Sequence, residues 1–424
     1  MHPGVSRRHV LKAGGACALA MPFVAPRLMA ASANDVLNVG MIGIGGMGNG
    51  HLGRCLGHAG VRVVAVCEVD AKRRRAARDR VHQRYAEKLK SGAYKGCAEY
   101  GDFRELLARD DIDAVMIATP DHWHTLISMA AARAGKDIYC EKPLTLTIGE
   151  SKRIIEVVRQ CGTVFQTGSQ QRSGYSGKFR FASEMVRSGR IGELKTCHVS
   201  VGGPSGDCFL PAEATPDWMD WDMWLGPAPV RPFSSKLHPA SWRGYRDYSG
   251  GGMTDWGAHH FDICQWALDA DTSGPVEILP PGAKGAERLT FRYANGVEVY
   301  HGGYTGQGGN GITFTGSKGK IEVSRSDLKT FPGEIMRSPI GPDEVQLYRS
   351  GNHFQNWLDC IRTRRRPVCD VEIGARSVTV CHLGNLAYWL KRPLRWNPKA
   401  WDFVDDPGAS RWIDRPMRAP WSLA

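Results

Sequence analysis

The glycine-rich turn at residues 43–48 constrains the fold of this chain more than any other stretch. It comes at the end of Val36–Ile44, a compact apolar run typical of a buried parallel strand. In the spacing Gly43-x-Gly45-x-x-Gly48, the first glycine permits a tight turn and the second lets backbone approach a pyrophosphate. The third lets a helix pack on the strand, so that the helix N-terminus faces the phosphates. Met47 lies in the same turn. Taken alone, the glycine spacing is weak evidence for a dinucleotide-binding fold.

The first half of the chain alternates strand-like and helix-like segments. β-rich runs recur at Val61–Cys67, Ala114–Thr119 and Asp137–Cys140, and helical patterns such as Thr125–Ala134 lie between them. Polar loops follow the strands at their carboxyl ends. This alternation predicts a doubly wound α/β fold with a parallel sheet, in which ligands bind at the carboxyl edge.

An acidic residue follows the second strand at the position that reads the adenosine ribose. Glu68 comes twenty residues after Gly48, where a carboxylate accepts hydrogen bonds from the ribose hydroxyls and repels a 2′-phosphate. It therefore favours NAD over NADP. Asp70 is a competing candidate, and Lys72 and Arg73 leave NADP open.

Lys142 is the first candidate for proton chemistry. It stands in Glu141-Lys142-Pro143 at the end of a buried strand, beside the expected place of a nicotinamide. The following proline restricts the backbone of the lysine, and a lysine so held suits proton exchange with a substrate hydroxyl. A surface lysine in a β–α turn is an equal alternative from spacing alone.

A second candidate site follows the glycine triplet 250–252. The apolar residues after it fit a helix, on which Asp255 and Asp262 lie four residues before and three after His259. A histidine flanked by carboxylates can be a general acid–base group held in one tautomer. A metal pair is the alternative, but no third ligand has a suitable spacing, and we expect no metal.

The N-terminus has the order of an export signal. Arg7 and Arg8 precede an Ala/Gly-rich apolar stretch at 13–25 and the small residues Ala31-Ser32-Ala33. We interpret residues 1–33 as a twin-arginine signal peptide that directs the protein to the periplasm through the twin-arginine machinery. No later stretch approaches the roughly 20 apolar residues needed to span a bilayer, so we expect no stable membrane anchor.

Composition narrows the partners. The formal charge is +12, but the basic residues are scattered and no nucleic-acid motif is present, so we expect a solvated basic surface and no nucleic-acid partner. The chain has 12 cysteines without metal-type spacing. We expect mostly free thiols; Cys360, Cys369 and Cys381 form the cluster in which a disulfide stays an open alternative.

Four motifs taken together resemble the Gfo/Idh/MocA oxidoreductases. They are the 43–48 turn, Thr119-Pro120 with His124, Glu141-Lys142-Pro143 and the 250–262 motif, and the resemblance covers nearly the whole mature chain. It implies a Rossmann domain at 34–160 and a C-terminal α/β domain at 161–424. The second domain is expected to carry a large open, mainly antiparallel sheet with strands near 195–201, 288–293 and 297–302, and to form a homo-oligomer.

The resemblance also implies roles for individual residues. Lys142 matches the lysine that contacts the reacting hydroxyl, Asp255 the aspartate that orients the substrate, and His259 the proposed acid–base histidine. The residues expected at the cofactor are Gly43, Gly45, Met47, Gly48, Glu68, Thr119, Pro120, His124, Glu141 and Lys142. Those expected at the substrate, with weaker support, are Gln170, Arg172, Trp242, Arg243, Tyr245 and His260. Trp123 and Trp256 are open between ligand contact and core.

The implied reaction is reversible hydride transfer between a nicotinamide cofactor and a hydroxyl carbon of a sugar or polyol. Because free cofactor is scarce outside the cytoplasm, an exported enzyme has to retain its cofactor and return the hydride to a substrate. Two mechanisms satisfy this requirement: a ping-pong oxidoreductase, and a redox-neutral glycosidase that oxidises its sugar transiently. A non-catalytic sugar- and nucleotide-binding protein is the third hypothesis.

Overall fold

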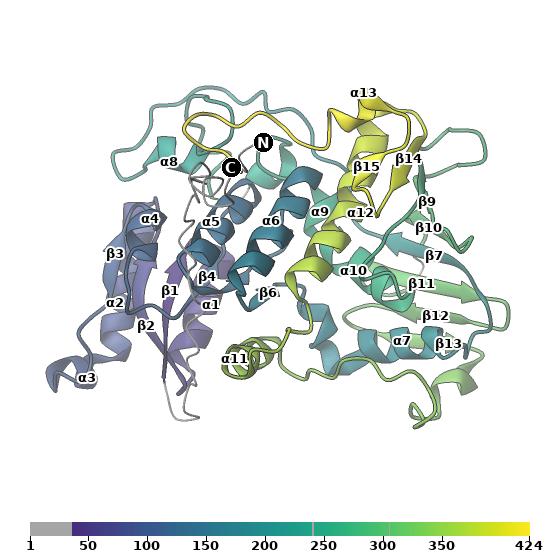
Figure 1. Ribbon diagram of the computed structural model, residues 1–424, viewed down its shortest axis with the longest axis horizontal. Coiled ribbons are helices and arrows are strands. Elements are labelled where there is room, and N and C mark those ends of the chain that lie inside the picture. Colours follow the sequence, from purple (N-terminus) through teal and green to yellow (C-terminus); the bar gives the residue numbers. More distant parts are fainter. Residues whose placement is uncertain (1–35, 240, 305) are drawn as a thin grey trace, which may run out of the picture.

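The computed structural model describes residues 36–239, 241–304 and 306–424, and it places two sheets at opposite ends of the molecule with helices between them (Figure 1). The interpreted signal peptide at 1–33 lies outside the described residues. The prediction of a Rossmann sheet followed by a mainly antiparallel sheet is confirmed.

The first sheet is parallel throughout, in the order β3-β2-β1-β4-β5-β6. Its central strands, β1, β2, β4 and β5, are buried on both faces, which explains their largely apolar sequences. The strands are β1 Leu37–Ile42, β2 Val61–Cys67, β3 Ala98–Tyr100, β4 Ala114–Ile117, β5 Asp137–Cys140 and β6 Phe165–Thr167. The helices of this domain are α1 Gly46–Leu56, α2 Ala71–Arg84, α3 Ala86–Lys90, α4 Phe103–Leu107, α5 Asp121–Arg133 and α6 Ile148–Cys161.

The order of the strands changes direction at β1, with β2 and β3 on one side of it and β4, β5 and β6 on the other. In sheets of this kind, ligands bind at that switch point, at the carboxyl ends of the strands. β6 pairs with β5, so the sheet continues past residue 160, where the sequence placed the end of the domain. The physical reason is that α6 is a crossover helix, and the chain after it returns to the sheet as one more parallel strand.

The second sheet has nine strands in the order β13-β12-β11-β7-β10-β9-β8-β14-β15, in which only β7 and β10 run parallel. The expected strands near 195–201, 288–293 and 297–302 correspond to β7, β9 and β10. The strands are β7 Leu194–Ser200, β8 Glu277–Leu279, β9 Thr290–Arg292, β10 Glu298–His301, β11 Gly311–Gly316, β12 Lys320–Val323, β13 Leu328–Phe331, β14 Leu394–Asn397 and β15 Asp402–Phe403. The remaining helices are η1 Gln170–Arg172, η2 Tyr175–Gly177, α7 Lys178–Arg187, α8 Trp221–Leu225, η3 Ser241–Gly244, α9 Gly252–Asp255, α10 Gly257–Ala267, η4 Gly333–Met336, α11 His353–Thr363, α12 Val371–Leu390 and α13 Pro407–Ser410.

Helices from the far end of the chain complete the first core. α12 lies between α6 and α10, in the space between the two sheets (Figure 1). α11 and the first turns of α12 bury apolar side chains, among them Trp357 and Val371, in the same cluster as the parallel strands. The nucleotide-binding core therefore contains residues that are more than 180 positions later in the sequence than its last strand.

A third, smaller core belongs to a segment that we call the tryptophan cap, residues 206–239 and 241–249. Its buried centre is mainly aromatic, and Trp221 and Trp224 stack with their ring centroids 4.5 Å apart. The cluster consists of Met219, Trp221, Trp224, Leu225, Ala228, Phe233, Leu237, Trp242 and Tyr248.

Candidate active site

The three motif glycines differ in what surrounds them. Gly43 has φ +85°, and a Cβ there would lie 2.7 Å from the backbone of Ala118. A Cβ on Gly48 would lie 2.0 Å from the carbonyl oxygen of Gly43. A Cβ on Gly45 would meet only a guanidinium nitrogen of Arg73, at 3.7 Å. Gly43 and Gly48 are thus required by the protein itself, whereas Gly45 leaves space for a ligand.

A cavity of about 360 Å³ opens at this turn. Its floor is the carboxyl edge of β1, β2 and β4, and its roof is the tryptophan cap. The predicted cofactor residues Gly43, Gly45, Met47, Glu68, Thr119 and Pro120 line the floor, while Met223, Trp224, His238, Pro239, Trp242 and Arg243 line the roof. The predicted substrate residues Trp242 and Arg243 therefore border the cofactor cavity.

Backbone hydrogen bonds attach the cap to the turn between β2 and α2. The amide of Ala71 donates to the carbonyl of Trp218 at 2.9 Å, and the amide of Asp220 donates to the carbonyl of Val69 at 3.2 Å. The Lys72 ammonium lies 4.5 Å from the centroid of the Trp218 ring. The cap is thus joined to the protein at the place where the sequence predicts the adenosine ribose.

Glu68 borders the cavity, and its carboxylate accepts hydrogen bonds from the amides of Ile44 at 2.7 Å and Asp70 at 3.1 Å. Asp70, the competing candidate, is committed elsewhere: it caps α2 and contacts His238 at 3.2 Å. Arg73 lines the cavity as well. The Glu68 carboxylate and the Arg73 guanidinium thus both line the ribose end of the cavity, so neither NAD nor NADP is excluded there.

The cavity fits a dinucleotide. The N-terminus of α1 has no side-chain cap, so its amides are free to meet a pyrophosphate. The Thr119 hydroxyl is buried at the cavity and has no hydrogen-bond partner among the residues that the structure describes. Buried polar groups normally have partners, and a bound ligand would supply this one.

Lys142 and Asp255 come together from the two domains. The Lys142 ammonium donates to Oδ1 of Asp255 at 2.7 Å and to the Asp255 carbonyl at 3.0 Å. Nε of Arg243 lies 3.6 Å from the same carboxylate oxygen. Since Arg243 also lines the cavity, this pair stands at the end of the cofactor cavity, with about a tenth of the lysine and a quarter of the aspartate side chain exposed.

His259 is neutral at the edge of this site. Burial, followed by the charges of Lys142 and Arg325, holds its pKa well below the usual value. Its Nδ1 has no hydrogen-bond partner in the described chain. The motif is two helices rather than one, because α9 ends at Asp255 and α10 begins at Gly257. Burial also lowers the pKa of His260 to about 3, and this ring lies fully buried under Trp256, so it does not reach a substrate as expected.

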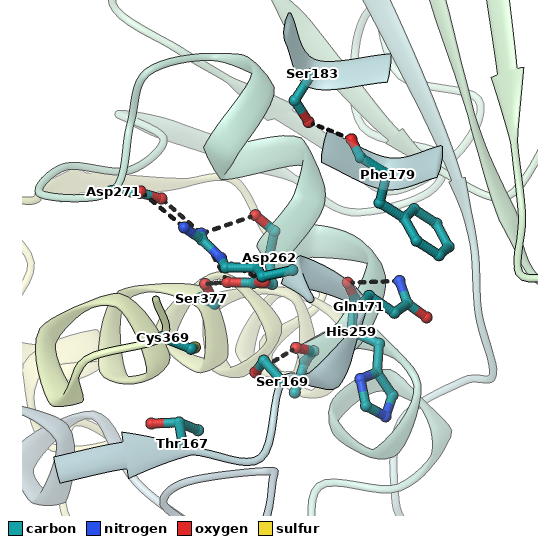
Figure 2. Close-up of polar contacts among 12 residues, drawn as sticks. Thr167, Ser169, Gln171, Phe179, Ser183, His259, Asp262, Asp271, Cys369 and Ser377 are labelled. Carbon is teal, nitrogen blue, oxygen red and sulfur yellow. Dashed lines mark hydrogen bonds and ion pairs between the residues drawn. The ribbon is translucent and has the colours of Figure 1, made fainter. Parts of the chain in front are cut away.

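The carboxylate expected beside His259 pairs with a different residue. Asp262 accepts from Nε and Nη2 of Arg172 at 2.8 and 2.9 Å, and Asp271 binds the same guanidinium. Figure 2 shows Asp262, Asp271 and Ser377 gathered in this network, with the His259 ring turned away from them. Arg172, which the sequence analysis expects at the substrate, is buried here and paired with two carboxylates of the protein.

His124 connects two loops of the site. Its ring nitrogens lie 2.8 Å from the carbonyl of Pro143 and 2.9 Å from that of Thr119, and the side chain is fully buried. It therefore holds together the loops that carry Thr119 and Lys142, and its own contact with the cofactor stays a prediction.

Glu141 is also held from behind. Nε2 of His51 on α1 donates to its carboxylate at 2.7 Å, and Gln170 donates at 3.3 Å. Burial alone would raise the pKa of Glu141, but the hydrogen bond from His51 and the charges of His51 and Lys142 bring it below the ordinary value. The Glu141 carboxylate is therefore ionised, and it also accepts a hydrogen bond from the backbone amide of Lys142 at 3.2 Å. His51 thus supports Glu141 from α1, a contact that the sequence motif did not reveal.

Three further predicted residues have mixed outcomes. Tyr245 is half-buried against the aromatic core of the cap and lines no part of the cavity. Trp123 lines the cavity and donates from its indole to the Trp224 carbonyl, so it belongs to both ligand site and core. Trp256 is half-exposed beside Asp255.

Asp121 was missed by the sequence motifs, although it directly follows Thr119-Pro120. It is fully buried and accepts a hydrogen bond from the Ser249 hydroxyl at 2.6 Å. Burial raises the pKa of this carboxyl to about 7; the Ser249 hydrogen bond and the charges of Arg243 and Lys142 lower it, and the charge of Asp255 raises it.

This shift predicts a pH-dependent stability. Because the folded pKa of Asp121 lies above the value of about 3.9 in the unfolded chain, its contribution is fully present below pH 4 and is lost as the pH rises through 7. Between pH 5 and pH 8 the loss amounts to about 2–3 kcal/mol. Asp121→Asn should abolish this part of the profile, measured as the free energy of unfolding in urea. The exposed carboxyl variant Asp217→Asn is the control, and an unchanged profile in Asp121→Asn would contradict the assignment.

The described residues hold no group of side chains arranged for a metal ion and no helix long and apolar enough to cross a membrane. Eleven cysteines lie in the described part of the chain and all are free, including the buried Cys360, Cys369 and Cys381.

A parallel dinucleotide sheet joined to an open mixed sheet, with a lysine–aspartate pair at the end of the cofactor cavity, defines a two-domain nicotinamide-dependent oxidoreductase. The chain belongs to the Gfo/Idh/MocA oxidoreductase family. Residues 37–169 match its NAD-binding Rossmann fold, and residues 203–423 match its C-terminal alpha/beta domain.

Curated relatives include two kinds of enzyme. The chain is 33% identical over 164 residues to inositol 2-dehydrogenase of Salmonella typhimurium, and 32% identical over 214 residues to an alpha-N-acetylgalactosaminidase of Shewanella oneidensis. These stretches are 38% and 46% of this chain, and in both cases 45% of the relative, so the chain spans less than half of these relatives. Among solved structures, the aldose-aldose oxidoreductase of Caulobacter crescentus shares the fold, with a TM-score of 0.57 and 17% identity over 85% of this chain and 100% of the other.

Proposed function

We propose that this protein is an exported oxidoreductase that transfers hydride to and from a hydroxyl carbon of a sugar or polyol, and that it retains its cofactor between turnovers. The observation that carries this proposal is the Lys142–Asp255 pair, 2.7 Å apart, at the end of the dinucleotide cavity. A bound nicotinamide supplies the hydride acceptor and donor. The other steps fall to residues of the chain.

Those residues divide the proton work. Lys142 contacts the reacting hydroxyl and exchanges its proton, since its amine is partly exposed and hydrogen-bonded to Asp255. Asp255 orients both Lys142 and the substrate through its two oxygens. His259, neutral and with a free Nδ1, is able to accept a proton or to hold a second hydroxyl. Glu141 and His51 keep Lys142 in place from behind.

Retention of the cofactor is supported by the roof of the cavity. The tryptophan cap covers the adenosine end and is attached to the turn after β2 by backbone hydrogen bonds. Arg7 and Arg8 support export through the twin-arginine route, which moves folded proteins. A cofactor bound in the cytoplasm would therefore travel inside the protein. Glu68 favours NAD in this role, Arg73 leaves NADP open, and assembly into a homo-oligomer stays a prediction.

A second candidate is a redox-neutral glycosidase, which the alpha-N-acetylgalactosaminidase relative favours. In this mechanism the sugar is oxidised to a ketone, which acidifies the neighbouring C–H bond. That carbon loses its proton as the aglycone leaves the anomeric carbon, water adds across the resulting double bond, and the ketone is reduced again. The same Lys142 and His259 would serve, so no separate carboxylate pair is required.

The two candidates separate in one experiment. The mature protein is purified without added cofactor, its bound nicotinamide is followed by absorbance, and it is incubated with free sugars and with aryl glycosides. Oxidoreduction predicts that the reduced band appears with one sugar and bleaches with a second. Hydrolysis predicts release of the aglycone with no net change in that band. Absence of bound dinucleotide in the purified protein would refute cofactor retention.

A further inference from the structure

Arg325 is a cation held at the edge of the active site by two aromatic rings. It lies in the turn between β12 and β13 and is half-buried. Its guanidinium carbon is 4.5 Å from the centroid of Trp256 and 5.0 Å from that of Tyr175. Nε donates a hydrogen bond to Oε1 of Gln171 at 3.0 Å. Three contacts thus fix the position of this side chain.

Its charge acts on the groups of the site. After burial, the charge of Arg325 is the second cause that lowers the pKa of His260, and it is among the causes that lower the pKa of His259. Trp256, on which it rests, follows Asp255 directly in the chain. The Trp256 ring also lies 6.1 Å from the His259 ring, so Arg325 stands on the same side of the site as His259 and Asp255.

No carboxylate of the described chain lies within ion-pair distance of Arg325, and its two Nη groups have no hydrogen-bond partner there. The contrast with Arg172, which is paired with two carboxylates, is direct. Burial lowers the pKa of Arg325; the Tyr175 ring against which it packs and the charge of Asp255, which makes no ion pair with it, oppose this shift. A partly desolvated guanidinium that lacks an anion in the protein is able to bind one from outside.

The form of the side chain indicates which kind of anion. Aromatic faces hold the guanidinium plane, so the edge with its two Nη groups remains available. Parallel N–H groups on that edge match the two oxygens of a carboxylate or phosphate. Lys142 and Arg243 do not compete for the anion, because both already contact Asp255.

We propose that Arg325 binds an anionic substituent of the substrate, so that this enzyme acts on acidic sugars, sugar carboxylates or sugar phosphates, in preference to neutral ones. The inference rests on the proposed function, since it names the substrate class of that same site. A hydrogen bond to a charged group changes binding by about ten- to a hundredfold, which is the preference expected for an acid over its neutral parent.

The test compares binding within matched sets. Glucose, sodium glucuronate and glucose 6-phosphate, and the corresponding galactose set, are titrated calorimetrically into the purified protein with its own cofactor. The uronate or the phosphate should bind at least about tenfold more tightly than the parent sugar, and the difference should shrink as salt is raised. Uronate against phosphate identifies which oxyanion the site prefers.

Variants assign that preference to Arg325. Arg325→Met keeps an apolar stem between the two rings, and it should abolish the preference while changing binding of neutral sugars by less than about twofold. Arg325→Lys should retain part of it, because the charge stays and the two-pronged geometry is lost. Arg411→Met, at an exposed arginine far along the chain, is the matched control.

The outcomes separate this inference from the proposed function, which is judged by turnover. Acids that bind no more tightly than neutral sugars, an acid preference that survives in Arg325→Met, or no saturable binding of any acid would each overturn the role of Arg325. If neutral sugars are still turned over in a Lys142-dependent way, the proposed function stands without it. If acids bind through Arg325 but no sugar is oxidised or cleaved, the role of Arg325 in binding stands and the proposed function is refuted.

Discussion

Replacement of Lys142 by methionine is expected to lower the turnover of sugar by about 10²–10⁴-fold, the usual contribution of a general acid–base group. The ammonium makes the 2.7 Å contact to Asp255 and is the cation nearest the reacting hydroxyl in the proposed mechanism. Methionine has a similar length, so the packing against α9 is retained. Turnover is measured with bound cofactor, by stopped-flow absorbance of the nicotinamide.

The control for this variant is Lys152→Met, at an exposed lysine on α6 that should have wild-type turnover. The bound dinucleotide of Lys142→Met should remain stoichiometric, since its loss would show that the lysine holds cofactor rather than moves a proton. Unchanged turnover in Lys142→Met would remove the catalytic assignment altogether.

The second large effect concerns the glycine turn. Gly45→Val should weaken dinucleotide binding by about ten- to a hundredfold, because overpacking of this size costs 1–3 kcal/mol and the added methyls occupy the space of the pyrophosphate. The protein itself has room, since the nearest atom to a Cβ at this position is Arg73 Nη1 at 3.7 Å, and the backbone at φ −68° and ψ −165° is open to any residue. Cofactor content and thermal midpoint are measured on the same preparation.

Gly50→Ala is the matched control on the same helix. No atom lies within 4 Å of a Cβ there, so cofactor content should be unchanged and the helix slightly stabilised, by about 0.5–1 kcal/mol. A Gly45→Val protein that unfolds together with its loss of cofactor would show that the glycine serves the fold. Full cofactor content would show that the pyrophosphate lies elsewhere.

The fold was predictable because its signals are local. Strand-like runs alternate with helices, and the spacing of Gly43, Gly45 and Gly48 predicts a tight turn, a close approach to the pyrophosphate and a close packing of helix on strand. The strand after α6 was missed at the domain boundary, since a three-residue strand has little pattern to detect. The meeting of Lys142 with Asp255, 113 positions apart, was expected from the family resemblance and from no property of either residue alone.

What the sequence did not reveal depends on distant partners. Arg172 and Arg325 are the same residue type, yet Arg172 is paired with Asp262 and Asp271 while Arg325 has no carboxylate partner among the described residues, and only the packing distinguishes them. His51 is hydrogen-bonded to Glu141 and Asp121 to Ser249, and these partners lie 90 and 128 positions away in the sequence. The substrate contact expected of His260 meets a local obstacle instead, because Trp256, four residues earlier, stacks on its buried ring.

The late helices of the nucleotide-binding core have a consequence for the order of events in synthesis. Trp357 and Val371 complete a core whose strands end at residue 167, so a nascent chain that has emerged only through β6 still exposes that apolar surface to water. A stable cofactor site is therefore expected only after nearly the whole polypeptide has left the ribosome. This order of events is compatible with the proposed twin-arginine export, in which the protein would fold and bind its cofactor before it crosses the membrane.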